Sequence, residues 1–199
     1  MDRALAVRRL QTLVGRDLHT VAQRHGVNVV AASGKINKGW AGQTIERFLG
    51  MAYDVGQAPD FGDWELKVVP LQHRKDGTLR FKETMAITQM QLDHVASTSF
   101  EHSHLKNKLD RLLIVARIVG AHALDPSFIH SVVPVNLVGP VLDQVKADYL
   151  EIQRCIRSGH DIHGSVGTLV QSRTKGAGHG SKSRAFYAKS DFLKLFIQV

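Results

Sequence analysis

Apolar residues recur every three or four positions in several parts of the chain, which is the spacing of a helix that buries one face. The first such run covers residues 3–25 and is interrupted near Gly15. A second run covers residues 38–49 and stops before Gly50, a residue type that often closes helices. A third run covers residues 138–157. These patterns predict amphipathic helices in all three places.

Other segments carry the pattern of β-strands. Residues 111–119 form a continuous apolar run rich in β-branched side chains, which predicts a fully buried central strand. The pair Asp76-Gly77 is a two-residue hairpin signal and predicts that residues 79–81 return antiparallel to the preceding strand. Further strands are predicted at residues 65–71, 84–87, 127–135, 168–171 and 185–187.

Two shorter segments complete the predicted elements. Residues 103–109 favour a short helix or a turn. Ser190 is placed to cap a last helix over residues 191–196, because a serine side chain accepts from the first free backbone amides of a helix.

The composition favours a globular protein that binds a polyanion. The chain has 199 residues, 43% hydrophobic content and a net charge of +8, which suits one domain with a full core and an attraction for nucleic acid. Its one cysteine, Cys155, cannot form an internal disulfide, so a reducing cytoplasm is expected. No apolar run is long enough to cross a membrane, and the N-terminus lacks the apolar core of a signal peptide.

Candidate chemistry is concentrated in residues 59–67, PDFGDWELK. Glu65 and Lys67 project from one face of the predicted strand because side chains alternate along a strand, and Asp60 stands in the preceding turn. Two carboxylates can hold Mg²⁺, and a lysine beside them can activate water or neutralise a phosphate. The pattern D-x-x-x-x-E-x-K is loose, and on its own it occurs more often at a solvated strand edge than in a catalytic site.

Two other features bear on function. Residues 173–184 hold several basic side chains among glycines and serines, a composition suited to DNA phosphates and to reading guanine. The eleven histidines include close pairs, but no cysteine partners or H-E-x-x-H motif accompany them, so structural zinc is not expected.

Four blocks of the sequence together resemble one family. The chain is similar to the MutH-like DNA endonucleases, which comprise the mismatch-repair nicking endonuclease and related restriction endonucleases. The blocks are KGWAGQTIERFLG at 38–50, PDF and WELKVVPL within 59–71, SHLKNKLDRLLIV at 103–115, and RAFYAKSDF at 184–192.

The resemblance implies an α/β fold, the PD-(D/E)XK restriction-endonuclease-like mixed β-sheet flanked by helices. It implies that Asp60, Glu65 and Lys67 are catalytic, that Glu46 is an added acid near the metals, and that Asp60, Glu65 and Glu46 bind Mg²⁺. The segment between Asp60 and Glu65 is shorter than in the family's mismatch-repair members, which keeps Asp63 open as an alternative to Asp60. From the residues alone, Glu46 fits a solvated helix charge equally well.

The resemblance also implies which residues contact double-stranded DNA. Lys38 is expected near the site and Lys108 near the cleaved bond, although without the resemblance the sequence favours ordinary surface lysines at both positions. The remaining expected DNA contacts are Arg173, Thr174, Lys175, Arg184 and Tyr187.

The chain is therefore expected to form one endonuclease domain over residues 1–199. Within it we expect an N-terminal helical part at 1–37, a catalytic part at about 38–135 and a C-terminal DNA-recognition part at about 136–199.

The function expected from the sequence is that of a Mg²⁺-dependent, sequence-specific DNA endonuclease. The short Asp60–Glu65 spacing and the glycine-rich loop differ from the mismatch-repair members, which favours a type II restriction endonuclease acting as a homodimer or transient dimer on DNA. A MutH-type nicking endonuclease of DNA mismatch repair, working with an ATPase partner, is the alternative. A DNA-binding module without catalysis is a further alternative.

Overall fold

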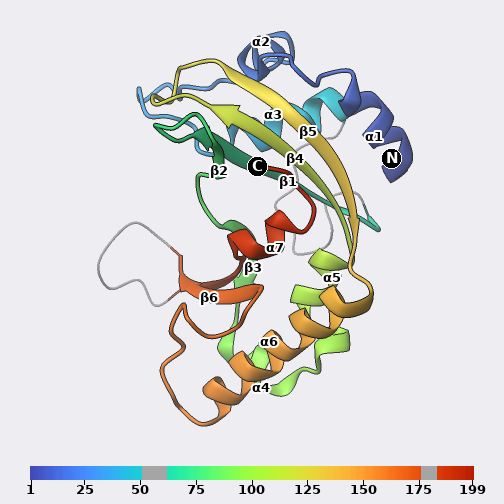
Figure 1. The fold of residues 1–199 in the computed structure, drawn as a ribbon, viewed down its shortest axis with the longest axis vertical. Helices are drawn as coiled ribbons and strands as arrows, with labels where there is room; N and C mark the ends of the chain where they lie inside the picture. Colours follow the sequence, from blue (N-terminus) through green and yellow to red (C-terminus); the bar gives the residue numbers. More distant parts are fainter. Residues whose placement is uncertain (51–61, 176–182) are drawn as a thin grey trace.

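The computed structural model describes residues 1–50, 62–175 and 183–199. It contains two β-sheets that lie in different parts of the molecule, each with its own helices (Figure 1). The four-stranded sheet has the order β2-β1-β4-β5, and the three-stranded sheet has the order β3-β7-β6. Helices and strands thus form the mixed α/β architecture expected from the sequence.

The four-stranded sheet is mixed, because β1 runs parallel to β4 while the other neighbours are antiparallel. The apolar run predicted as a central strand is β4, and it lies between β1 and β5. The strands are β1 (Glu65–His73), β2 (Leu79–Phe81), β4 (Arg111–Val119) and β5 (Ser127–Asn136).

Three N-terminal helices cover one face of this sheet (Figure 1). They are α1 (Arg3–Gln11), α2 (Leu18–Arg24) and α3 (Trp40–Leu49). Leu10, Ile45 and Leu113 are among the buried side chains of this first core. The helix α3 ends at Gly50, whose φ of 86° is a left-handed conformation that favours glycine. The break near Gly15 and the end of α3 are both as predicted.

The three-stranded sheet is antiparallel and combines segments far apart in the chain. Its strands are β3 (Met85–Met90), β6 (Val170–Thr174) and β7 (Arg184–Ala188). The helical elements on this side are α4 (Leu92–Ser97), η1 (Phe100–His102), α5 (His104–Asp110), α6 (Gly139–Arg157) and α7 (Ser190–Lys194).

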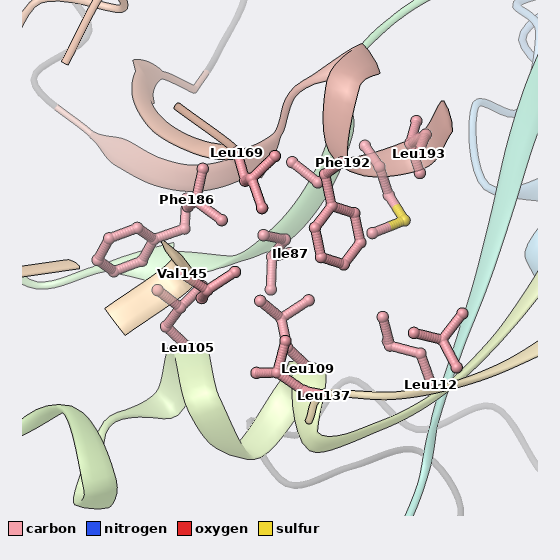
Figure 2. Packing of buried hydrophobic residues seen from close by; sticks show 14 of the residues in the cluster. Ile87, Leu105, Leu109, Leu112, Leu137, Val145, Leu169, Phe186, Phe192 and Leu193 are labelled. Carbon is pink, nitrogen blue, oxygen red and sulfur yellow. The ribbon is translucent and has the colours of Figure 1, made fainter. Parts of the chain in front are cut away.

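A second apolar core joins the two sheets. Ile87 of β3, Leu112 of β4 and Phe186 of β7 belong to the same buried cluster, with side chains of α5, α6 and α7 packed around them (Figure 2). Burying this apolar area holds the smaller sheet against the larger one, at about 25 cal/mol for each Å² removed from water.

Asp148 of α6 fixes the chain where it enters the smaller sheet. Its buried carboxylate accepts hydrogen bonds from the backbone amides of Thr168, Leu169 and Val170, at 2.7, 2.6 and 2.7 Å. Three donors on one buried carboxylate make the start of β6 a fixed point.

The structure corrects three details of the predicted elements. The hairpin after β1 returns antiparallel as predicted, but its loop covers residues 74–78, because Asp76 accepts from the amide and hydroxyl of Thr78 and widens the turn. Ser190 is the first residue of α7, whose N-cap is Lys189. The helix α4 was not predicted, and it has only one buried residue, Val95, to provide a pattern.

No helix in the described part of the chain is both long enough and apolar enough to cross a membrane.

Candidate active site

Glu65 and Lys67 stand at the start of β1 on the same face of the strand, as the two-residue spacing predicts. The Lys67 amine lies 2.6 Å from Oε1 of Glu65. The Glu65 side chain is only 1% exposed, whereas that of Lys67 is 20% exposed. The carboxylate is therefore inside the protein and the lysine reaches toward its surface.

Lys108 completes this cluster from a different element. It lies on α5, and its amine is 2.8 Å from Oε2 of Glu65. The Lys108 side chain is 6% exposed, so the interpretation of Lys108 as an ordinary surface lysine is wrong. Ser103 caps the N-terminus of α5, because its hydroxyl accepts from the Lys106 amide.

Each oxygen of Glu65 thus contacts a different lysine. Ion pairs are strong where water is excluded, but a buried charge without its partner is costly. Within these three side chains the positive charge exceeds the negative charge by one. Such a cluster favours a further anion nearby, such as a second carboxylate or a phosphate.

The other expected acids are placed differently. Glu46 lies on α3, which packs against β1, and one of its carboxylate oxygens is buried. The alternative of a fully solvated helix charge therefore does not hold for Glu46. Asp63 is exposed and forms an ion pair with Arg111. Asp60 lies outside the described residues.

The donor chemistry near Glu65 fits a hard cation. Carboxylate oxygens are the ligands that Mg²⁺ prefers, and Glu65 offers them at a buried position. The described residues alone contain no group of three His, Cys, Asp or Glu side chains able to hold a metal ion.

The edge of β1 that carries this cluster is open to a ligand. Within the described sheet, β2 pairs with β1 only from Leu71 to His73. A cavity of about 300 Å³ lies along the remaining edge and is lined by Lys67, Glu83 and Tyr187, among others. The site therefore opens between the two sheets.

Two neighbouring cavities extend this opening. One, of about 590 Å³, is lined by Lys38, Glu83, Thr84, Arg173, Thr174, Lys175 and Tyr187. The other, of about 350 Å³, contains Arg117. Glu83 lines all three cavities, so they adjoin one another, and together they are called the groove.

The residues expected to contact DNA divide into two groups. Lys38, Arg173, Thr174, Lys175 and Tyr187 line the same cavity. Arg173 donates to the Thr84 hydroxyl at 3.0 Å and its guanidinium lies 5.8 Å from the centre of the Tyr187 ring.

Arg184 is engaged inside its own sheet. Its Nε donates to the Ser172 hydroxyl at 2.8 Å, and its terminal nitrogen donates to the carbonyl of Ile162. Its expected contact with DNA stays a prediction. The segment 176–182 lies outside the described residues.

The sequence interpretation did not single out Glu83, Thr84 or Arg117, although all three line the groove. Arg117 had a recognisable signal, since it interrupts the apolar run of β4 with a charge. Glu83 and Thr84 stand between two strands and had no comparable signal.

Comparison with known proteins supports the resemblance to the MutH-like endonucleases. The family model of the DNA mismatch repair enzyme MutH matches residues 49–123, a segment that includes Glu65, Lys67 and Lys108. The MutH protein of Actinobacillus pleuropneumoniae is 28% identical over 181 residues, which cover 87% of this chain and 76% of that protein. That of Vibrio cholerae is 28% identical over 193 residues, covering 94% and 84%.

A solved structure also aligns with this chain. It is the restriction endonuclease MvaI in complex with its cognate DNA substrate, at 13% identity and a TM-score of 0.44, covering 99% of this chain and 98% of that one.

Proposed function

We propose, proceeding from the similarity of most of the chain to MutH proteins, that this protein is a metal-dependent endonuclease that hydrolyses a phosphodiester in double-stranded DNA. The observation that carries the proposal is the Lys67–Glu65–Lys108 cluster, which lies inside the segment matched by the MutH family model.

The groove between the sheets suits DNA. Lys38, Lys67 and Arg173 place cationic groups along it, and the chain as a whole carries a net charge of +8. Positive side chains neutralise phosphates and release counterions, which supplies most of the sequence-independent affinity for DNA. Arg173 and Tyr187 lie together at one end and are suited to contact base edges.

The three residues of the cluster have separate roles in this proposal. Glu65, together with Asp60, would hold Mg²⁺, with Glu46 near it. When bound, the metal would supply charge for the phosphate oxygens and lower the pKa of water. Lys67 is partly exposed and lines the cavity, so its amine reaches a phosphate oxygen or the attacking water. Lys108 is buried and positions the Glu65 carboxylate.

The curated relatives support the mismatch-repair alternative better than the restriction enzyme that the sequence interpretation placed first. We therefore propose strand nicking, stimulated by an ATPase partner, as the activity. In this role the protein works in the cytoplasm, where the DNA of a bacterial cell is located. The division into helical, catalytic and recognition parts remains a prediction.

The topology of a supercoiled plasmid tests this choice. Incubated with Mg²⁺, the protein is expected to convert supercoiled plasmid to the open-circular form, because only one strand is cut. Linear plasmid as the first product would instead establish a restriction enzyme. Binding without any cleavage in Mg²⁺ would leave only a DNA-binding module.

A further inference from the structure

The cavity around Arg117 is separate from the catalytic cluster but adjoins its groove. It shares Pro70 and Glu83 with the cavity beside Lys67. Arg117 pairs with Pro70 in the register of β1 and β4, three residues beyond Lys67. At about 3.3 Å for each strand residue, this places the two positions about 10 Å apart along the strands. Because the offset is odd, Arg117 lies on the sheet face that packs against Trp40 of α3, and Lys67 lies on the opposite face, at the open edge of β1.

Arg117 is held in one orientation. Its guanidinium lies 5.0 Å from the centre of the Trp40 ring, and a terminal nitrogen donates to the Ser127 hydroxyl at 2.7 Å. The Trp40 ring stacks on His19, with 4.4 Å between ring centres and 14° between planes. A guanidinium fixed on an aromatic ring loses little further freedom when it binds a ligand.

Part of the Arg117 guanidinium is buried without a hydrogen-bond partner in the described part of the chain. The buried atom is its Nε, and none of the described ion pairs includes Arg117. Burial lowers the pKa of Arg117, while the carboxylate of Glu83 acts in the opposite direction. A partly buried cation of this kind gains from an anion brought to it.

Two lysines line the same cavity. Lys38 and Lys82 are exposed, so both amines can move toward a ligand. The acidic side chains of the cavity are Glu83 and Asp125, and Asp125 already accepts from the His122 amide at 2.8 Å. The three cationic side chains outnumber the two carboxylates, so the lining of the cavity carries an excess of one positive charge.

We infer that the cavity of Lys38, Lys82 and Arg117 binds a backbone phosphate of the DNA, away from the bond that is cut. This inference rests on the proposed function, because the cavity adjoins the groove in which DNA is proposed to bind. A DNA phosphate is therefore the anion that can reach it. The forked donors of Arg117 match the geometry of a phosphate.

Salt dependence of binding tests the inference without requiring cleavage. The probe is a fluorescent random-sequence duplex in Ca²⁺, and the readout is the slope of log affinity against log salt concentration. Arg117→Met should make the slope less steep by about 0.9, the value for one phosphate contact. Arg117→Lys keeps the charge and should keep the slope. Arg154→Met, at an exposed position on α6, is the matched control and should match the wild type.

Lys82→Met provides an independent variant if Arg117→Met does not fold, because Lys82 is exposed and its side chain forms no described hydrogen bond or ion pair. Its slope should also become less steep than that of the wild type. Unchanged slopes in the folded variants would overturn the inference. Wild-type protein that binds the duplex but does not cut plasmid in Mg²⁺ would instead remove the proposed function, so the two failures are distinguishable.

Discussion

The amine of Lys108 lies 2.8 Å from Oε2 of Glu65, although 43 residues separate them in the chain. The contact joins α5, which packs in the core shared by both sheets, to the start of β1, where the candidate catalytic residues stand. A change in the position of α5 therefore alters the geometry of the site directly. The consequences of this pairing can be measured in stability as well as in activity.

Glu65→Gln should lower the free energy of unfolding by about 3–5 kcal/mol, because it breaks the buried ion pair with Lys108. Lys108→Met should cost less, since Lys67 remains paired with Glu65. The double variant should be more stable than the sum of the two single effects predicts. Urea unfolding of all four proteins measures this coupling. Strictly additive effects would show that the pair does not interact.

Asp148→Asn should destabilise the smaller sheet. The carboxylate accepts from three backbone amides and from the Gln144 side chain, and losing its charge should cost about 1.5–3 kcal/mol of unfolding free energy. Thermal or urea unfolding measures the loss. Asp143→Asn, at an exposed position of the same helix, is the control and should change little. Equal stability of the two variants would contradict the anchoring role of Asp148.

Arg173 and Arg184 should respond differently to truncation. Arg173→Ala should cost about 1–3 kcal/mol of discrimination between the preferred site and random DNA, because Arg173 lines the groove and is exposed. Arg184→Ala should mainly lower stability, because its guanidinium bonds Ser172 and Ile162. Competition binding with the two DNAs, together with unfolding of each variant, separates the roles. Similar losses on both DNAs for Arg173→Ala would indicate phosphate contact only.

The elements with strong periodicity were predictable from the sequence. The strand β4 and the helix α6 bury regular stripes of apolar side chains, and both lie where the pattern placed them. The short helix α4 was missed because its fold depends on contacts with α6. Gln153 of α6 donates to the carbonyls of Val95 and of Thr98, the residue after α4, and Tyr149 donates to that of Thr98. Such tertiary contacts leave no periodic trace in a segment of six residues.

The candidate site was predictable only in part. The pairing of Glu65 with Lys67 follows from alternation along one strand, so the sequence sufficed. The burial of Lys108 against Glu65 depends on how α5 meets the sheet, which no local pattern shows. Arg117 was predictable as an anomaly in an apolar run, but its role needs the position of Trp40 in the folded chain.

The central claim is that the Glu65–Lys67 cluster cuts DNA, and the most direct measurement is the rate of Mg²⁺-dependent plasmid cleavage at saturating protein. The account predicts that Lys67→Met slows cleavage by about 10²–10⁴-fold, the range for loss of a proton-transferring group. Glu65→Gln should cut no faster than Lys67→Met. The control Glu101→Gln changes an exposed residue paired with Lys146 and should cut at the wild-type rate. All three should still bind duplex DNA in Ca²⁺. Cleavage by Glu65→Gln at the wild-type rate would contradict the account and place the catalytic centre elsewhere.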